Sequence, residues 1–232
     1  KYLEAKLSIA RALSQSKKVP KFMIANADDK EAVKFFEQVR PVSEFSGLTC
    51  KQLPYSLKNV EPWKTLDDGI EFVFDNQKII SPLRGKFNIY NALAAAETSR
   101  AFGVKTEVIK NALAKISEIP GRVESIPFDF PQGKKRFEVI VDYAHTPDSL
   151  RALYEAFPPR LSSGQARKLI CVLGNTGGGR DTWKRPAMGK IADKYCDEII
   201  LTNEDPYDED PRKIVDEMAV VIRPEKLTIE MD

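Results

Sequence analysis

The sequence places its only histidine beside a carboxylate, at the end of an apolar run. In VIVDYAHTPDSL, residues 139–150, the run ends at Asp142 and His145 follows three residues later. Pro147 then opens an amphipathic segment, so the pair lies where a strand gives way to a helix. A carboxylate there either satisfies a turn or accepts hydrogen bonds from ribose hydroxyls. His145 has no nucleophile near it in sequence, so it is either structural or ligand-facing, and we do not assign it as a general base.

The glycine-rich segment GNTGGGRD is a second candidate site, and it follows the apolar run KLICVL. Gly174 and Gly179 have the spacing of a P-loop, but Arg180 and Asp181 stand where that loop needs lysine and Ser/Thr. The segment is therefore either a glycine turn or an anion site. In the second case backbone N–H groups, Arg180 and Arg185 would hold a carboxylate or a phosphate.

Acidic, amide and basic side chains mark three further candidates. NEDPYDED, residues 203–210, is either a solvated loop or a site that selects a cationic group. Asn88 and Asn91 lie three residues apart at a helix start, where they either cap the helix or read a purine and its sugar. Arg122 follows Gly121 at a domain boundary, as a solvated linker residue or a phosphate clamp.

Two patterns of secondary structure position these residues. Residues 2–15 and 31–39 show helical spacing around the strand-like KFMIANADD, and residues 42–83 read as short antiparallel strands before two helices. From residue 138 onward apolar strands alternate with amphipathic helices, and Asp210 is expected to cap one of them. This alternation predicts an α/β fold with a parallel sheet, whose ligands gather at the carboxyl ends of the strands.

Composition narrows the class of function. The net charge of +2 excludes a global basic field for nucleic acid, and no apolar run approaches the ~20 residues that cross a bilayer. The three cysteines have no CxxC spacing and are odd in number, which favours a reducing cytoplasm over a disulfide framework. One histidine leaves little for zinc, so oxygen-bound magnesium is the better metal candidate. The chain starts in a helical pattern without methionine, and we expect a fragment.

Four segments together resemble the Mur ligase superfamily, most closely its MurE-type UDP-N-acetylmuramoyl-tripeptide ligases. GKFNIYNALAAAE is similar to the family's G-x-F-N-x-x-N-x-x-A-A, and PGRVE to its G-R-x-E. VDYAHTPDSL is similar to D-Y-A-H-T-P-D, and GGGRDTWKRPAMG to G-G-x-R-D-x-x-K-R-P-x-M-G. The resemblance covers nearly the whole chain. It implies the C-terminal half of a P-loop-type central ATPase domain over 1–124, a linker over 125–136, and a Rossmann-like parallel-sheet domain over 137–232.

The resemblance also implies a reaction. In the cytoplasm such enzymes add lysine or meso-diaminopimelate to UDP-N-acetylmuramoyl-L-alanyl-D-glutamate, in peptidoglycan synthesis. ATP phosphorylates the terminal carboxylate, and the incoming amine displaces phosphate from that acyl phosphate. ATP and Mg²⁺ are the expected cofactors. The expected partners are the UDP-linked dipeptide and a free amino acid. The protein is expected to be monomeric, to bind no nucleic acid and not to insert in a membrane. The family's P-loop G-T-N-G-K-[ST] is absent from these 232 residues, so we expect that they alone do not catalyse ligation.

Carried over residue by residue, the resemblance assigns roles. Lys6, in YLEAK, matches a carbamylated lysine that binds magnesium. Arg122 matches an arginine that reaches the ATP phosphates, Asp142 a ribose-binding aspartate, and Arg180 an arginine that holds the carboxylate of the incoming amino acid. The residues expected to contact the nucleotide are Asn88, Asn91, Arg122, Asp142 and His145.

One departure concerns the amino acid that is added. Diaminopimelate-adding members carry D-N-P-R where this chain has Glu204, Asp205, Pro206 and Tyr207. Tyr207 replaces the arginine that would clamp the distal carboxylate, a contact worth ~1.5–3 kcal/mol. The local acidity instead suits a distal ammonium, as in lysine. Two alternatives stay open: a folylpolyglutamate synthase or another Mur step, and a nucleotide-binding module without catalysis.

Overall fold

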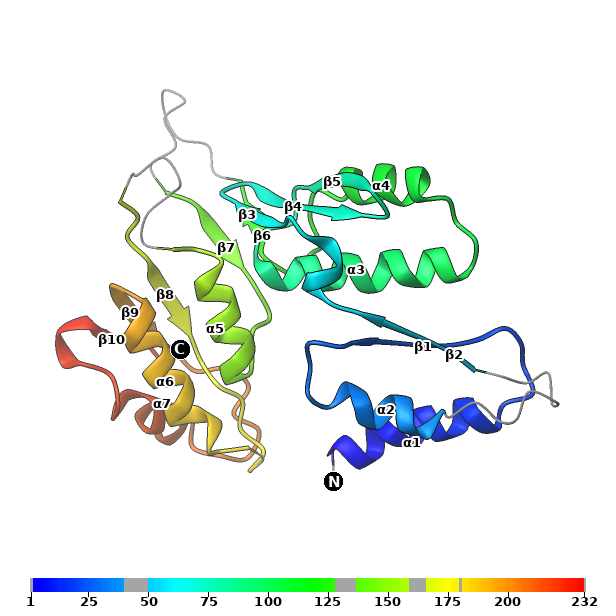
Figure 1. Ribbon diagram of the computed structural model, residues 1–232. Helices are drawn as coiled ribbons and strands as arrows, with labels where there is room; N and C mark the ends of the chain where they lie inside the picture. Colours follow the sequence, from blue (N-terminus) through cyan, green and yellow to red (C-terminus); the bar gives the residue numbers. More distant parts are fainter. Residues whose placement is uncertain (1, 40–49, 128–136, 159–165, 180, 232) are drawn as a thin grey trace. The chain divides into compact units, whose positions relative to one another are not determined.

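The computed structural model forms two compact units, which divide between Ser117 and Glu118. Each unit is described by itself below (Figure 1). The linker expected over 125–136 falls mainly outside the described residues, so the domain boundaries stay a prediction. The described residues are 2–39, 50–127, 137–158, 166–179 and 181–231.

The first unit opens with two helices beside a two-stranded parallel sheet. Lys21 of the first strand lies opposite Cys50 of the second, and Ala10, Val39 and Cys50 are buried together beneath them. The helices and the first strand are confirmed. The expectation of antiparallel pairing is wrong for the strand at Cys50, because the chain returns through a helix and runs in the same direction as its neighbour. The elements are α1 (Tyr2–Gln15), β1 (Lys21–Asn26), α2 (Ala32–Gln38) and β2 (Cys50–Tyr55).

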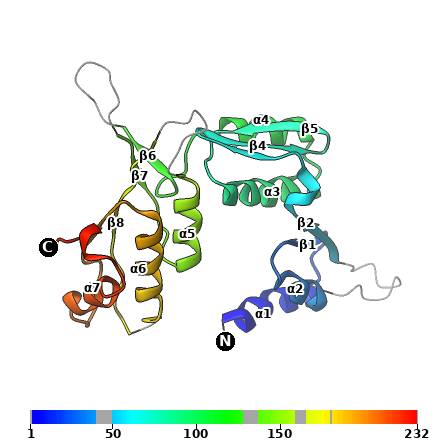
Figure 2. The ribbon, with the colours of Figure 1, turned by 60° about the vertical axis from the view of Figure 1, so that its left-hand side comes forward.

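A second layer of the first unit packs two helices on an antiparallel sheet. Figure 2 shows α3 and α4 along one face of this sheet. Phe72, Ile79, Ile89 and Leu93 form its core, with exposed fractions of 0–1%. The antiparallel pairing expected here is confirmed. The elements are η1 (Leu57–Val60), β3 (Lys64–Leu66), β4 (Gly69–Phe74), β5 (Gln77–Ser81), α3 (Lys86–Ala101) and α4 (Thr106–Lys115).

The second unit is built around the expected parallel sheet, in the strand order β10-β9-β8. One hydrophobic core joins its strands and helices, and it includes Leu150, Met188, Ile199 and Val215. Asp210 caps α7 as predicted, since its side chain accepts a hydrogen bond from the Arg212 N–H. The elements are β6 (Glu124–Ile126), β7 (Val139–Val141), α5 (Pro147–Glu155), β8 (Ile170–Leu173), α6 (Lys184–Tyr195), β9 (Glu198–Leu201), α7 (Pro211–Ala219), η3 (Pro224–Lys226) and β10 (Leu227–Ile229).

Strand β7 differs from the expectation. It does not pair with β8 in the described ladders but runs antiparallel to β6, with Glu124 opposite Val141. The Tyr143 N–H donates to the Gly121 carbonyl at 3.1 Å, which extends the contact beyond the strands. The consequence is functional, because the segment before β6 and the segment after β7 become neighbours.

Two of the three cysteines are joined. Cys171 in β8 and Cys196 at the end of α6 form a disulfide, with their Cα atoms 6.1 Å apart. Cys50 is free and buried. The expectation of unpaired thiols is therefore wrong, because the fold brings together two cysteines that are 25 residues apart and show no telling spacing. Among the described helices none is long and apolar enough to span a membrane.

Replacing Gly189 by alanine is expected to lower the free energy of unfolding by about 1–2 kcal/mol. A Cβ at this buried position on α6 would collide with the Met218 carbonyl oxygen of α7 and lie 2.8 Å from Val221 Cγ2. That overpacking outweighs the better helix propensity of alanine. Urea unfolding measures the change. Lys190→Ala, at the exposed next residue, is the control, and equal midpoints for the two variants would contradict the prediction.

Candidate functional site

The β6–β7 pair brings one group of predicted site residues together. The Val123 N–H donates to the Asp142 carboxylate at 2.9 Å. The Arg122 guanidinium lies 4.9 Å from the centroid of the Tyr143 ring, and that ring lies 4.7 Å from the His145 ring. Arg122, Tyr143 and His145 are all exposed. We call the set Arg122, Asp142, Tyr143 and His145 the stacked group. Its geometry offers a cation, a carboxylate and aromatic faces to one ligand.

Val123 holds a strained backbone beside this group. Its φ of 52° is in the left-handed region, which costs an L-residue roughly 1–2 kcal/mol and is rare for β-branched side chains. The hydrogen bond to Asp142 fixes this conformation and with it the direction of Arg122. Such strain clusters at functional sites. Nothing in the sequence reveals it, and Tyr143 was also not singled out as a ligand-facing residue.

His145 is oriented by its own turn. Its Nδ1 lies 3.1 Å from the Tyr143 carbonyl oxygen, so this contact is a hydrogen bond when Nδ1 carries the proton. Thr146 then caps α5: its hydroxyl accepts from the Ser149 N–H at 3.2 Å, and the Ser149 hydroxyl accepts from the Thr146 N–H at 3.0 Å. This capping box sets where the helix starts. His145 is thus presented at a fixed turn and has no catalytic partner in its group.

The two asparagines of the first unit act on one another. Asn88 is 5% exposed, and its amide donates to the Arg84 carbonyl at 2.7 Å. Its Oδ1 accepts from the Asn91 amide at 2.9 Å. Gly85, with φ 91°, is the N-cap of α3, so Asn88 is not the cap. Asn88 therefore orients Asn91, which is exposed. A nucleotide contact by either residue stays a prediction.

Lys6 lies exposed on α1, with Nζ 5.4 Å from the Tyr2 ring centroid. The nearby Glu4 is paired with Arg11 at 2.7 Å. Within the described ranges no three His, Cys, Asp or Glu side chains come together as a metal-binding group. These residues therefore do not fit a complete Mg²⁺ site, and no chemical step can be assigned to the ion from them.

In the second unit the glycine loop, residues 174–179, crosses the acidic loop, residues 204–210. The Gly177 N–H donates to the Asp205 carbonyl at 2.9 Å, and a Cβ on Gly177 would collide with the Pro206 carbonyl oxygen. Only glycine allows the two backbones to lie this close. Glu204, Asp205, Pro206 and Tyr207 are thereby brought against the glycine loop. Arg180, expected at the amino-acid carboxylate, lies outside the described residues.

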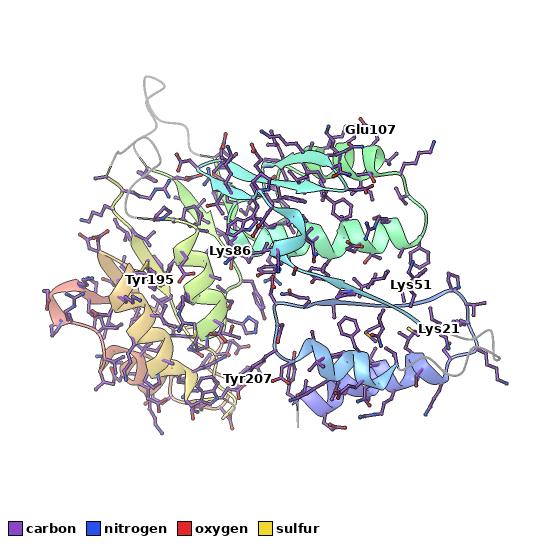
Figure 3. All side chains as sticks on the ribbon, viewed as in Figure 1. Lys21, Lys51, Lys86, Glu107, Tyr195 and Tyr207 are labelled. Carbon is purple, nitrogen blue, oxygen red and sulfur yellow. A yellow bond between two sulfur atoms is a disulfide. The ribbon has the colours of Figure 1, made fainter. Side chains whose placement is uncertain are left out.

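Tyr207 belongs to the acidic loop, which connects β9 to α7 along the chain, and Figure 3 labels its side chain. Its side chain is 68% exposed, and its φ of 51° is left-handed. A Cβ on Gly178 would lie 3.5 Å from the Tyr207 ring, in ordinary contact. The ring therefore rests on the glycine loop while one face stays open to a ligand.

Arg185 does not have the role expected for it. Its side chain is 1% exposed, and it pairs with Glu209 and Glu217, which are 21% and 33% exposed. Nη1 and Nη2 donate to the two Glu209 oxygens at 2.9 and 3.0 Å, and Nη1 also reaches Glu217 at 2.9 Å. A guanidinium occupied in this way cannot also hold a substrate carboxylate. Sequence reasoning saw the charge of Arg185 but not the carboxylates that the fold supplies.

The Arg185–Glu209 pair has a pH signature. The pKa of Glu209 is lowered from 4.5 to about 2, first by the Arg185 hydrogen bond and then by the Gly179 N–H, with a smaller contribution from Lys213. Because the folded-state value is the lower one, this stabilisation is complete above about pH 4.5 and is lost as the pH falls towards 2. As the pH falls from 4.5 to about 2, the urea midpoint of wild type should therefore decrease more than that of Glu209→Gln. Parallel pH curves for the two proteins would refute this.

Comparison with known proteins identifies both units. Residues 1–99 match the model of the Mur ligase middle domain. Residues 121–231 match that of the Mur ligase glutamate ligase domain. Together these two models cover most of the chain and contain every predicted site residue.

Two curated relatives carry the name UDP-N-acetylmuramoyl-L-alanyl-D-glutamate–2,6-diaminopimelate ligase. The protein of Thermosynechococcus vestitus is 43% identical over 149 residues, 64% of this chain and 28% of its own length. That of Syntrophomonas wolfei is 36% identical over 226 residues, 94% of this chain and 42% of its own length. The chain thus spans less than half of the relatives that it matches.

Solved structures agree with the fold. A structure of a UDP-N-acetylmuramoyl-L-alanyl-D-glutamate–2,6-diaminopimelate ligase is 26% identical, with a TM-score of 0.54 over 100% of this chain and 46% of the other. A Mycobacterium tuberculosis folylpolyglutamate synthase complexed with ADP gives a TM-score of 0.69 at 16% identity, over 97% and 49% of the two chains. The second likeness concerns the fold alone.

Proposed function

The chain belongs to the Mur ligase family, and we propose that its full-length protein is an ATP-dependent amide ligase of peptidoglycan synthesis in the cytoplasm. Its acceptor is UDP-N-acetylmuramoyl-L-alanyl-D-glutamate, and it acts as a monomer. The acceptor carboxylate attacks the γ-phosphorus of ATP and releases ADP. The amine of the incoming amino acid then attacks the acyl carbon, loses a proton and expels phosphate. Such chemistry depends on positioning and charge neutralisation.

The observation that carries the proposal is the stacked group. Arg122 comes from the segment before β6 and lies on Tyr143, one residue from the Asp142 carboxylate. A guanidinium suits the phosphates of a nucleotide and a carboxylate suits its ribose hydroxyls, so one small area can bind both the phosphates and the ribose of ATP. His145 faces the same ligand. In the first unit we assign nucleotide contacts to Asn88 and to Asn91, which Asn88 orients. None of these roles requires proton transfer.

The second unit supplies the incoming amino acid's contacts. We assign Arg180 to its carboxylate, and Glu204, Asp205, Pro206 and Tyr207 to its side chain. The two relatives are named for 2,6-diaminopimelate, which favours that amino acid. Tyr207, an uncharged ring among acidic residues, offers no cation to the distal carboxylate of diaminopimelate, and this favours lysine, whose distal end carries only an ammonium. Lys6, once carbamylated, would offer oxygen ligands to Mg²⁺ together with groups from outside this chain.

Phosphate release from ATP by the full-length protein tests the proposal. The UDP-linked dipeptide is supplied with lysine, meso-diaminopimelate or ornithine in parallel. We expect release that requires both the dipeptide and one amino acid. Release with a folyl acceptor instead would point to a folylpolyglutamate-type relative. ATP binding by a folded protein without turnover on any acceptor would favour a non-catalytic nucleotide-binding module.

A further inference from the structure

Two loops that approach the incoming amino acid in the proposed function are joined at two separate places. The first is the backbone crossing, where the Gly177 N–H meets the Asp205 carbonyl. The second is Glu209, whose Oε1 accepts from the Gly179 N–H at 2.6 Å. Glu209 lies two residues after Tyr207, and Gly179 lies one residue before Arg180. The glycine loop and the loop that carries Tyr207 are therefore tied together by a single carboxylate.

Arg185 holds that carboxylate in place. Its fork meets both Glu209 oxygens, at 2.9 and 3.0 Å, in a bidentate pair. Nη1 also reaches Glu217 on α7 at 2.9 Å, and Nη2 lies 3.4 Å from the Thr176 carbonyl of the glycine loop. The arginine therefore contacts the glycine loop, the acidic loop and α7 from one buried position. Bidentate arginine–carboxylate pairs fix geometry as well as charge.

Burial makes this arrangement stiff. Arg185 is 1% exposed, whereas most ion pairs of this unit lie on the surface, such as Arg212–Asp216 at 58% and 54%. A surface ion pair is screened by solvent and its side chains are mobile, so it contributes little to the stability of the fold. A buried fork has one arrangement available, so it transmits its position to the backbone of both loops.

We propose that the Arg185–Glu209 pair is a positioning device that fixes the loop of Tyr207 against the glycine loop at Gly179, and so sets the binding of the incoming amino acid. The inference rests on the proposed function for its substrate. Neither Arg185 nor Glu209 touches that substrate. Their effect is exerted through the backbone at Gly179 and through the loop that carries Tyr207.

The test uses Glu209→Gln and Arg185→Lys in the full-length protein. Each keeps a hydrogen-bonding group but loses the charged bidentate pair. We expect KM for the amino acid to rise about ten- to hundredfold, the scale on which small misplacements act, with KM for ATP unchanged. Arg212→Gln, which breaks the exposed pair on α7, is the matched control and should change neither constant.

Amide hydrogen exchange gives a readout that needs no turnover. In both variants the Gly177 and Gly179 amides should exchange faster than in wild type, while amides of β9 keep their protection. If the variants change amide exchange as expected but the wild-type protein ligates no amino acid, the proposed function is wrong. The role of the Arg185–Glu209 pair in joining the two loops would still hold. The inference is overturned if the amino-acid KM stays at the wild-type value, or if the KM for ATP rises by a similar factor. It is also overturned if loop exchange is unchanged.

Discussion

Replacing Tyr207 by arginine in the full-length protein is expected to raise kcat/KM for meso-diaminopimelate relative to lysine by roughly 10- to 150-fold. The acidic loop is fixed against the glycine loop at Gly177, so residue 207 is presented at a set place. Its side chain is 68% exposed, and a guanidinium can replace the ring without loss of core packing. That guanidinium would form a charge-assisted bond with the distal carboxylate, which lysine lacks. Steady-state kinetics with both amino acids measures the ratio.

Tyr207→Gln is the control for this exchange, because it removes the ring and adds no charge. It should leave the preference between the two amino acids near that of wild type. If the Tyr207→Arg protein has the melting temperature of wild type and the same ratio of kcat/KM values for the two amino acids, residue 207 does not contact the distal end of the amino acid. The specificity would then have to come from residues elsewhere in the protein.

Replacing Arg122 by methionine is expected to lower kcat by roughly 10²–10³-fold, the usual effect of removing one group that stabilises developing charge. The side chain is exposed and stacks on Tyr143 at 4.9 Å. No buried carboxylate is left unpaired by its loss, so folding should be retained. Single-turnover phosphate release separates the chemical step from binding, and the melting temperature reports on the fold.

Arg151→Met provides the comparison for Arg122→Met. Arg151 is an exposed arginine of α5 that pairs with Asp148 at 3.2 Å, and it belongs to no proposed site. Its replacement should leave kcat unchanged. If Arg122→Met keeps most of its kcat but melts lower than wild type, the Arg122–Tyr143 stack is a structural contact and the phosphate role is wrong.

The periodic elements were predictable from the sequence because local pattern decides them. The alternation after residue 138 gave the parallel sheet, and Asp210 followed by Pro211 gave the start of α7. The partner of β7 was not predictable, since a short run such as Val139-Ile140-Val141 is apolar in either sheet. It pairs instead with β6, which the chain enters through Gly121 and Val123, both at positive φ.

Site residues were predictable from the sequence only where the chemistry of the side chain suits one kind of ligand group, such as a carboxylate for ribose hydroxyls. Asp142 and Arg122 were named from their chemistry and are neighbours in the structure, although their ligand stays a prediction. Arg185 was misjudged, because its partners Glu209 and Glu217 lie 24 and 32 residues away. Tyr143 was overlooked because its role depends on the Arg122 guanidinium, which comes from the distant segment before β6. The sequence shows which side chains are charged, whereas the fold determines which of them are already paired with another side chain.

The crossing of the two loops at Gly177 has a consequence for how this protein can diversify. Neither loop can gain a side chain or a residue at the crossing without displacing the other, so a viable change there needs simultaneous changes in both. Residue 207 lies beyond the crossing, and its side chain is 68% exposed, so this side chain can change without displacing the backbone of the glycine loop. Under the proposed function, a change at the single codon for residue 207 can therefore alter which amino acid is accepted, while the loop crossing that presents this residue is inherited unchanged.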